Sequence, residues 1–118
     1  MVYICFMNKY RTIVFYKDYF QNFFNQQTNK VKDKIVWTFD LVEKLERVPD
    51  TYLKHIEDTD GLYEIRIQFS SDIFRVFCFF DSGKLIVVAN GFQKKTAKTL
   101  KKEIERALKI KAEYESEK

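Results

Sequence analysis

Residues 62–92 contain three runs of strand length that are separated by only two short polar segments. The runs, at 62–69, 73–80 and 84–92, are rich in the β-branched and aromatic residues that favour strands. The separating segments, at 70–72 and 81–83, consist of serine, aspartate and glycine, which are typical of hairpin turns. This pattern predicts a three-stranded antiparallel meander, and the rest of the chain has to fold around it.

The flanking segments predict one more strand and three helices. We expect a strand at 11–16, a helix that begins after Asp18, a helix at 30–47 and a helix at 98–114. The helices are indicated by apolar residues at helical spacing, most clearly by the stripe Val31, Ile35, Phe39, Val42 and Leu45. Pro49 ends the second helix, so residues 49–61 are expected to form a loop.

These elements follow one another in the order β-α-α-β-β-β-α. The 118 residues fit one domain, and 46% of them are hydrophobic, which is enough for a core. We therefore expect a single α+β domain over 1–118, with an antiparallel meander, an N-terminal antiparallel helical hairpin and a C-terminal helix. Residues 1–8 are expected to be a flexible extension, with Met7 as the natural start, and residues 115–118 a frayed tail.

The positive charge of the chain is concentrated near its C-terminus. Residues 82–118 carry 10 Lys or Arg and 5 Glu, a balance of +5, whereas the whole chain has a formal net charge of +4. The basic residues between 94 and 111 are Lys94, Lys95, Lys98, Lys101, Lys102, Arg106, Lys109 and Lys111. Such a patch favours a polyanionic partner, although a solvated helix face has the same composition.

Two arginines of the predicted meander are expected to face each other. If Ser70 and Ser71 form a two-residue turn, Arg66 lies directly opposite Arg75, with Cβ atoms ~5 Å apart. Like charges at this distance are unfavourable unless an anion lies between them, and the arginine fork matches phosphate oxygens. The alternative is that Glu64 and one acid of the 57–60 loop neutralise both arginines.

Lys94 and Lys95 follow the last predicted strand and precede the last helix, which Thr96 or Thr99 caps. A strand end that leads into a helix N-terminus favours phosphate binding, because the helix contributes amide donors and the positive end of its dipole. Phe92 and Tyr63 are candidate stacking platforms for bases, with burial in the core as the alternative.

Several classes of site are not indicated. The chain has no glycine-rich phosphate loop and no nucleophile elbow, and its one histidine, His55, has no nearby Cys or His with which to hold a metal. Cys78 lies in an apolar run typical of a buried thiol, and Cys5 is far from it, so no disulfide framework is predicted. No apolar run approaches the length of a membrane span, and a reducing cytoplasm is the expected location.

The motifs of this chain resemble the phage-derived HigB branch of the RelE toxin superfamily. The resemblance covers about residues 9–114 and is carried by a set of motifs in fixed order, namely Gly61–Arg66, Phe74–Phe80, Gly91–Thr96 with Lys98 and Thr99, and Glu103–Ala107. It implies a RelE-like domain that acts as a ribosome-dependent mRNA endonuclease, with a helix-turn-helix, HigA-like antitoxin as partner. No cofactor or metal is implied.

The resemblance also implies roles for individual residues. Arg75 would hold the scissile phosphate while the neighbouring 2′-hydroxyl attacks it, and Arg66 would share this role or bind the neighbouring phosphate. Lys95, with Lys94, would help to protonate the leaving 5′-oxygen or neutralise the transition state. The residues that would bind RNA are Lys98, Lys101, Lys102 and Phe92.

Two questions remain open from the sequence. Several relatives carry a tyrosine or histidine near the C-terminal end of the site, where this chain has Thr96, Lys98 and Thr99, so the general base is His55, Glu64 or a lysine. The basic patch is also compatible with a non-catalytic RNA- or DNA-binding module, or with a module that only binds an antitoxin.

Overall fold

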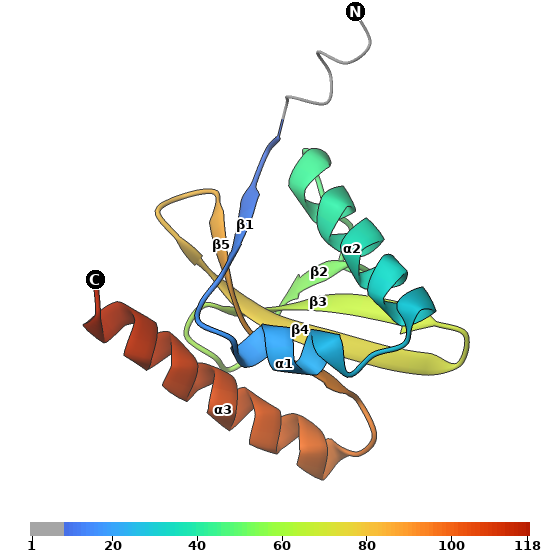
Figure 1. The fold of residues 1–118 in the computed structure, drawn as a ribbon. Helices are drawn as coiled ribbons and strands as arrows, with labels where there is room; N and C mark the ends of the chain where they lie inside the picture. The colour runs from blue at the N-terminus through green and yellow to red at the C-terminus, as the bar shows by residue number, and fades with distance from the viewer. Residues whose placement is uncertain (1–8) are drawn as a thin grey trace, which may run out of the picture.

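A computed structural model of the chain describes residues 9–118. In order, its elements are β1 (Thr12–Phe15), α1 (Tyr19–Asn25), α2 (Asn29–Lys44), β2 (Leu53–His55), β3 (Leu62–Phe69), β4 (Asp72–Asp81), β5 (Leu85–Gln93) and α3 (Ala97–Ser116) (Figure 1). The predicted α+β class is confirmed. The predictions for the 1–8 extension, including those for Met7 and Cys5, lie outside the described residues.

The predicted meander forms the centre of the sheet. β3, β4 and β5 pair antiparallel in sequence order, close to the predicted bounds. Ser70 and Ser71 form a two-residue turn between β3 and β4, in which Ser70 adopts a positive φ of 57°. The register therefore places Arg66 opposite Arg75, as predicted.

One further strand, β2, lies where the sequence predicted only loop. Leu53–His55 pairs antiparallel with β3, so the prediction of a loop through 49–61 is wrong at these three residues. Such a short strand has no recognisable period, and it exists because the edge of β3 offers free backbone partners. β1 pairs parallel with β5, and the sheet order is β1-β5-β4-β3-β2.

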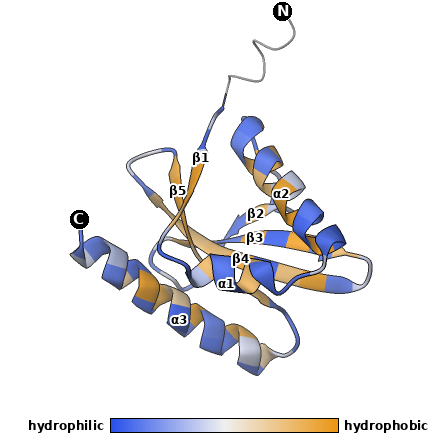
Figure 2. Ribbon diagram, in the orientation of Figure 1, coloured by the Kyte–Doolittle hydropathy of each residue, from blue (hydrophilic) through white to orange (hydrophobic). Residues whose placement is uncertain are grey.

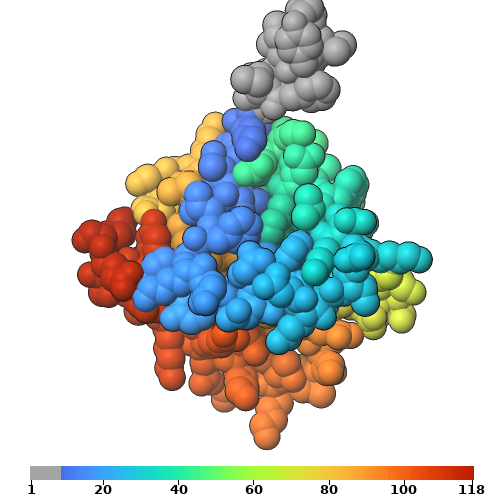
Figure 3. Space-filling model, viewed as in Figure 1, coloured from blue at the N-terminus to red at the C-terminus, as the bar shows by residue number. Residues whose placement is uncertain are grey.

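Helices cover both faces of the sheet. α1 and α2 pack on one face, where Phe20, Ile35 and Phe39 meet Ile65 and Ile67 of β3. Figure 3 shows β1, α1 and α2 together on the surface of the molecule that faces the viewer. α3 packs on the opposite face, and the strands between the two helical layers are largely hydrophobic (Figure 2).

The two N-terminal helices follow each other directly, and Phe20 of α1 contacts Phe39 of α2 with ring centroids 5.5 Å apart. α1 contacts β5, whereas α2 contacts β3 and β1, and Figure 1 shows the two helices at a wide angle. The α2 stripe is buried as predicted from Val31 to Val42, but Leu45 lies just beyond the end of the helix. Each helix therefore packs on its own part of the sheet.

The C-terminal residues, for which a frayed tail was predicted, contact the rest of the domain in this structure. α3 begins at the cap residue Thr96, whose side chain accepts a hydrogen bond from the amide of Thr99, and continues to Ser116. Beyond it, Glu117 accepts a hydrogen bond from the Tyr16 hydroxyl, and Lys118 forms a 2.9 Å ion pair with Asp81. Among residues 9–118, none of the helices has the length and apolar character of a membrane span.

Candidate functional site

A buried carboxylate joins two arginines on the α3 face of the sheet. Glu64 Oε2 accepts a 2.8 Å hydrogen bond from Arg75 Nη1, and Glu64 Oε1 lies 3.4 Å from Arg66 Nε. Glu64 is 6% exposed and Arg75 is 8% exposed, while Arg66 is half-buried. Glu64 thus offsets part of the like-charge repulsion, as the alternative interpretation expected, whereas no acid of the 57–60 loop forms an ion pair with either arginine.

The three charged residues border a pocket of about 300 Å³ between the sheet and α3. Arg66, Arg75 and Glu64 contribute the sheet side of this pocket. The neighbouring edge strand β2 adds Lys54 and His55, and α3 adds Leu100 and Ile104. We call this cavity the arginine pocket, and its lining combines cationic side chains with an apolar wall.

Lys54 is a member of the pocket that the sequence reasoning missed. It lies directly opposite Glu64 in the β2–β3 pairing, and none of the described residues forms an ion pair with it. Recognising strand β2 in the sequence would have predicted this position. Side chains of a strand alternate between its two faces, so Lys54 points to the α3 face because Leu53 is buried in the core on the other face. His55 follows, and its ring packs edge-on against Tyr63 with centroids 5.2 Å apart.

The pocket has the charge balance of an anion site. Lys54, Arg66 and Arg75 contribute three positive charges, whereas Glu64 and Glu57 contribute two negative ones. Arg75 Nε is buried and has no hydrogen-bond partner among the described residues. A buried donor without a partner is costly, so an acceptor oxygen placed there would be bound favourably.

The structure does not bring Lys94 and Lys95 into the lining of the arginine pocket. Both lysines are exposed in the short connection between β5 and α3. The Lys94 amide donates a 2.9 Å hydrogen bond to the carbonyl of Ile73, which ties this connection to the start of β4. Since Arg75 is only two residues along β4, the connection lies near the arginines without closing over them.

The lysines of α3 that were expected to bind RNA are at the surface. Lys98, Lys101 and Lys102 are exposed, and none of them forms an ion pair with another described residue. The Arg106 and Lys111 side chains, further along the helix, pair with Glu103 and Glu115. The unpaired charge is therefore concentrated on the first half of α3, next to the pocket.

Phe92 is a correction to the predicted site. Its side chain is only 6% exposed, and its ring contacts that of Phe77 with centroids 5.0 Å apart, beneath α3. A ring covered in this way has no free face on which a base could stack. Tyr63 is likewise part of the opposite core, where it contacts Phe80.

Cys78 shows no sign of a catalytic role. It is fully buried as a free thiol in the core between the sheet and α1 and α2, as predicted. Burial raises the pKa of the Cys78 thiol far above its usual range, so the nucleophilic thiolate is suppressed. In residues 9–118, no group of three His, Cys, Asp or Glu side chains could hold a metal ion.

A family model described as "Phage derived protein Gp49-like (DUF891)" matches residues 22–112. The chain belongs to this Gp49-like family. The matched range contains α2, the four strands β2 to β5 and most of α3, so it includes every residue of the arginine pocket. The Gp49-like family is associated with the toxins of toxin–antitoxin systems. No curated protein has a significant match to the chain.

Proposed function

We propose that this Gp49-like protein is the toxin of a type II toxin–antitoxin system and cleaves mRNA on the ribosome. The observation that carries the proposal is the cluster of Lys54, Arg66 and Arg75 around the buried Glu64. In the proposed reaction the 2′-oxygen of one nucleotide forms a bond to the adjacent phosphorus, and the bond to the 5′-oxygen breaks. The 2′-hydroxyl proton passes to a base, and the leaving 5′-oxygen receives a proton.

Arg75 is the residue that we assign to the scissile phosphate. Its link to Glu64 at 2.8 Å holds the guanidinium in place, while Nε lacks a partner. Hydrogen-bond donors that are already held in place stabilise the charge that develops in the transition state, because the protein does not have to rearrange during the reaction. Arg66, whose link to Glu64 is longer at 3.4 Å, binds the same or the neighbouring phosphate.

The lysines divide into two groups in this scheme. Lys95, with Lys94, protonates the leaving oxygen or neutralises the transition state, reaching the substrate from the β5–α3 connection. Lys98, Lys101 and Lys102 hold the RNA backbone along α3. Lys54 adds positive charge from the opposite side of the arginine pocket.

For the general base, we propose His55, or Lys54 in its neutral form in place of its role as a cation, and not Glu64. Both oxygens of Glu64 already contact arginines, so this carboxylate positions the guanidiniums. Lys54 faces the arginine pocket, whereas His55 borders it at the end of β2 with its ring packed against Tyr63. Of the variants His55→Gln and Lys54→Gln, the one that loses cleavage while keeping RNA binding identifies the base.

The partners in this proposal are an mRNA in the ribosomal decoding site and a helix-turn-helix, HigA-like antitoxin, both in the cytoplasm. A non-catalytic nucleic-acid- or antitoxin-binding module is the second candidate. The observation in its favour is that Lys94 and Lys95 do not line the arginine pocket. Cleavage on the ribosome separates the two.

Primer extension on an mRNA under translation tests the proposal. Wild-type protein should produce new 5′ ends only when ribosomes are present. Arg75→Lys keeps the charge but lacks the arginine fork, so cleavage should fall by roughly 10²- to 10³-fold. Arg106→Gln, which changes an exposed arginine outside the pocket, should cleave like wild type.

The outcomes separate the parts of the proposal. Absence of cleavage by the wild type on translating ribosomes refutes the nuclease function. Full cleavage by Arg75→Lys and Arg75→Ala, once circular dichroism shows that both are folded, refutes only the assignment of Arg75.

A further inference from the structure

A second cavity, of about 420 Å³, lies beside the arginine pocket at the open edge of β3. Arg66 lines both cavities and is the one residue that the two linings share, so the cavities adjoin at this residue on the exposed edge of β3. Lys34 of α2 and Tyr52 border the second cavity, and Gln68 and Ser70 close it at the end of β3. We call it the edge cavity.

The edge cavity exists because β2 is shorter than β3. The Arg66 amide donates a 2.9 Å hydrogen bond to the Tyr52 carbonyl, which lies just before the start of β2. Backbone groups of a strand point to the same edge at every second residue. The amide and carbonyl of Gln68 therefore face the edge beyond the last contact with this neighbouring segment, where they can hydrogen bond to a ligand.

The lining offers the three kinds of contact that a nucleotide needs. Lys34 and Arg66 are cations for a phosphate, and Lys34 forms no ion pair with any described residue. The hydroxyl of Ser70 and the amide group of Gln68 can hydrogen bond to a sugar or a base edge. For an aromatic contact, Tyr52 lies in the lining and Trp37 lies next to it, with ring centroids 6.1 Å apart.

We propose that the edge cavity binds one nucleotide of single-stranded RNA, the neighbour of the scissile phosphate. The RNA strand crosses Arg66 from the arginine pocket, its next phosphate lies between Arg66 and Lys34, and its base lies against Tyr52 with its edge toward Gln68. The volume falls in the range of small-ligand sites. The naming of the scissile phosphate rests on the proposed function, whereas RNA binding in the edge cavity does not.

Trp37 provides a direct readout, because it is the only tryptophan in the chain and is 48% exposed beside the edge cavity. The probe is a short 2′-O-methyl RNA of mixed sequence, which has no free 2′-hydroxyl and so is not cleaved. Its titration should change the Trp37 fluorescence and give a saturable curve. Lys34→Gln and Gln68→Ala should weaken binding by several-fold to about tenfold, the effect of one lost charge-assisted or neutral hydrogen bond.

Lys30→Gln is the matched control, since it removes the same charge from an exposed position on α2 that lies outside the edge cavity. Binding that is equally weakened by Lys30→Gln and Lys34→Gln would reflect general attraction only and overturn the proposal. Absence of a saturable Trp37 response would also overturn it.

Cleavage by the same variants distinguishes this inference from the proposed function. If wild-type protein cleaves mRNA, Gln68→Ala should change the distribution of bases next to the cut while leaving ribosome dependence intact. An unchanged distribution in both Gln68→Ala and Lys34→Gln would refute the edge cavity as the neighbouring subsite and leave the nuclease proposal standing. RNA binding at Lys34 without any cleavage would refute the nuclease function alone.

Discussion

Glu64 shows how the chain keeps two arginines close together before any substrate is bound. Its carboxylate contacts Arg75 at 2.8 Å and Arg66 at 3.4 Å in a site that is largely closed to water. Removing one partner of a buried ion pair leaves an uncompensated charge, which is strongly destabilising. If Glu64 were removed, a bound phosphate could replace its negative charge beside the arginines, so stability and anion binding are linked at this residue.

We predict that Glu64→Gln lowers the free energy of unfolding by about 3 kcal/mol, because Arg75 then remains buried without its counter-charge. Urea denaturation measures this change. Inorganic phosphate should stabilise the variant more than the wild type, since it no longer competes with a carboxylate.

The control for this substitution is Glu105→Gln, an exposed position on α3 whose side chain pairs with no described residue. It should change stability by no more than about 0.5 kcal/mol. Equal losses in the two variants would contradict the role assigned to Glu64, as would a phosphate effect that is larger in the wild type.

Gly91 is required by the close approach of β5 and α1. A Cβ atom at this position would lie 2.6 Å from Cδ2 and 2.9 Å from Cε2 of Phe23, which is too close for any real contact. We predict that Gly91→Ala destabilises the protein by about 1–3 kcal/mol through overpacking. Thermal or urea unfolding measures the loss.

A double-mutant cycle tests the cause of the Gly91 effect. Phe23→Leu removes part of the ring that the new methyl group would meet, so the double variant should lose less stability than the sum of the single losses. Simple additivity of the two losses would show that Gly91→Ala acts through something other than Phe23.

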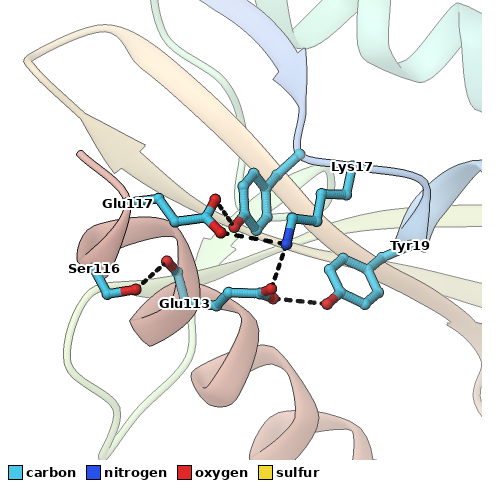
Figure 4. A network of polar contacts seen from close by, with 6 residues as sticks. Lys17, Tyr19, Glu113, Ser116 and Glu117 are labelled. Atoms are coloured by element: carbon cyan, nitrogen blue, oxygen red, sulfur yellow. Dashed lines mark hydrogen bonds and ion pairs between the residues drawn. The ribbon is translucent and has the colours of Figure 1, made fainter.

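At the scale of elements, the end of α3 is fastened to the segment before α1. Figure 4 shows Glu113 and Glu117 of this region around Lys17, with the Tyr19 hydroxyl donating to Glu113 at 2.7 Å. The Lys17 ammonium, and then the Tyr19 hydroxyl, hold the pKa of Glu113 below its ordinary value of 4.5. In the same way Lys118 and Tyr114 hold the pKa of Asp81 below 3.8.

We predict that the stability contributed by these contacts falls in acid, because the pKa of the Glu113 carboxyl is lower in the folded state than in the unfolded state. The contribution of Glu113 to stability is complete above about pH 4.5 and is lost as the pH falls through the lower pKa of the folded state. Wild type should therefore have a higher midpoint of thermal unfolding than Glu113→Gln at neutral pH, and the gap should close in acid.

Thermal unfolding from neutral pH down to about pH 3 measures this gap. Glu105→Gln again serves as the control, since its difference from wild type should stay small at every pH. A gap between wild type and Glu113→Gln that widens as the pH falls would contradict the assignment.

At the scale of the whole molecule, the unpaired positive charge lies on the first half of α3, beside the arginine pocket. RNA binding to such a surface releases counterions, so the affinity falls with salt by a slope of about 0.7 per phosphate neutralised on a single strand. Replacing Lys98, Lys101 and Lys102 together with Gln should lower that slope by about 2.

Fluorescence titration with the uncleavable RNA at several salt concentrations measures the slope. Arg106→Gln is the control, because Arg106 lies on the same helix but already faces Glu103 at 3.8 Å. A triple variant with an unchanged slope would show that these lysines do not contact the RNA backbone.

The sequence by itself determined those features that depend on neighbouring residues. The meander and the Arg66–Arg75 register follow from a two-residue turn, whose length alone decides which residues of a hairpin face each other. The buried stripe of α2 follows from helical period, and the burial of Cys78 follows from its apolar run. The positive charge of α3 also follows directly from the sequence, which contains its lysines and arginine.

Only the tertiary structure decided how distant segments meet. β2 forms on the free edge of β3 and places Lys54 beside Glu64, whereas α3 covers Phe92 and removes it from the candidate RNA surface. The Lys94–Lys95 connection lies outside the arginine pocket, and the short β2 leaves the edge cavity open. The physical reason is that these arrangements depend on packing free energies summed over elements far apart in the chain, which no local pattern of residues records.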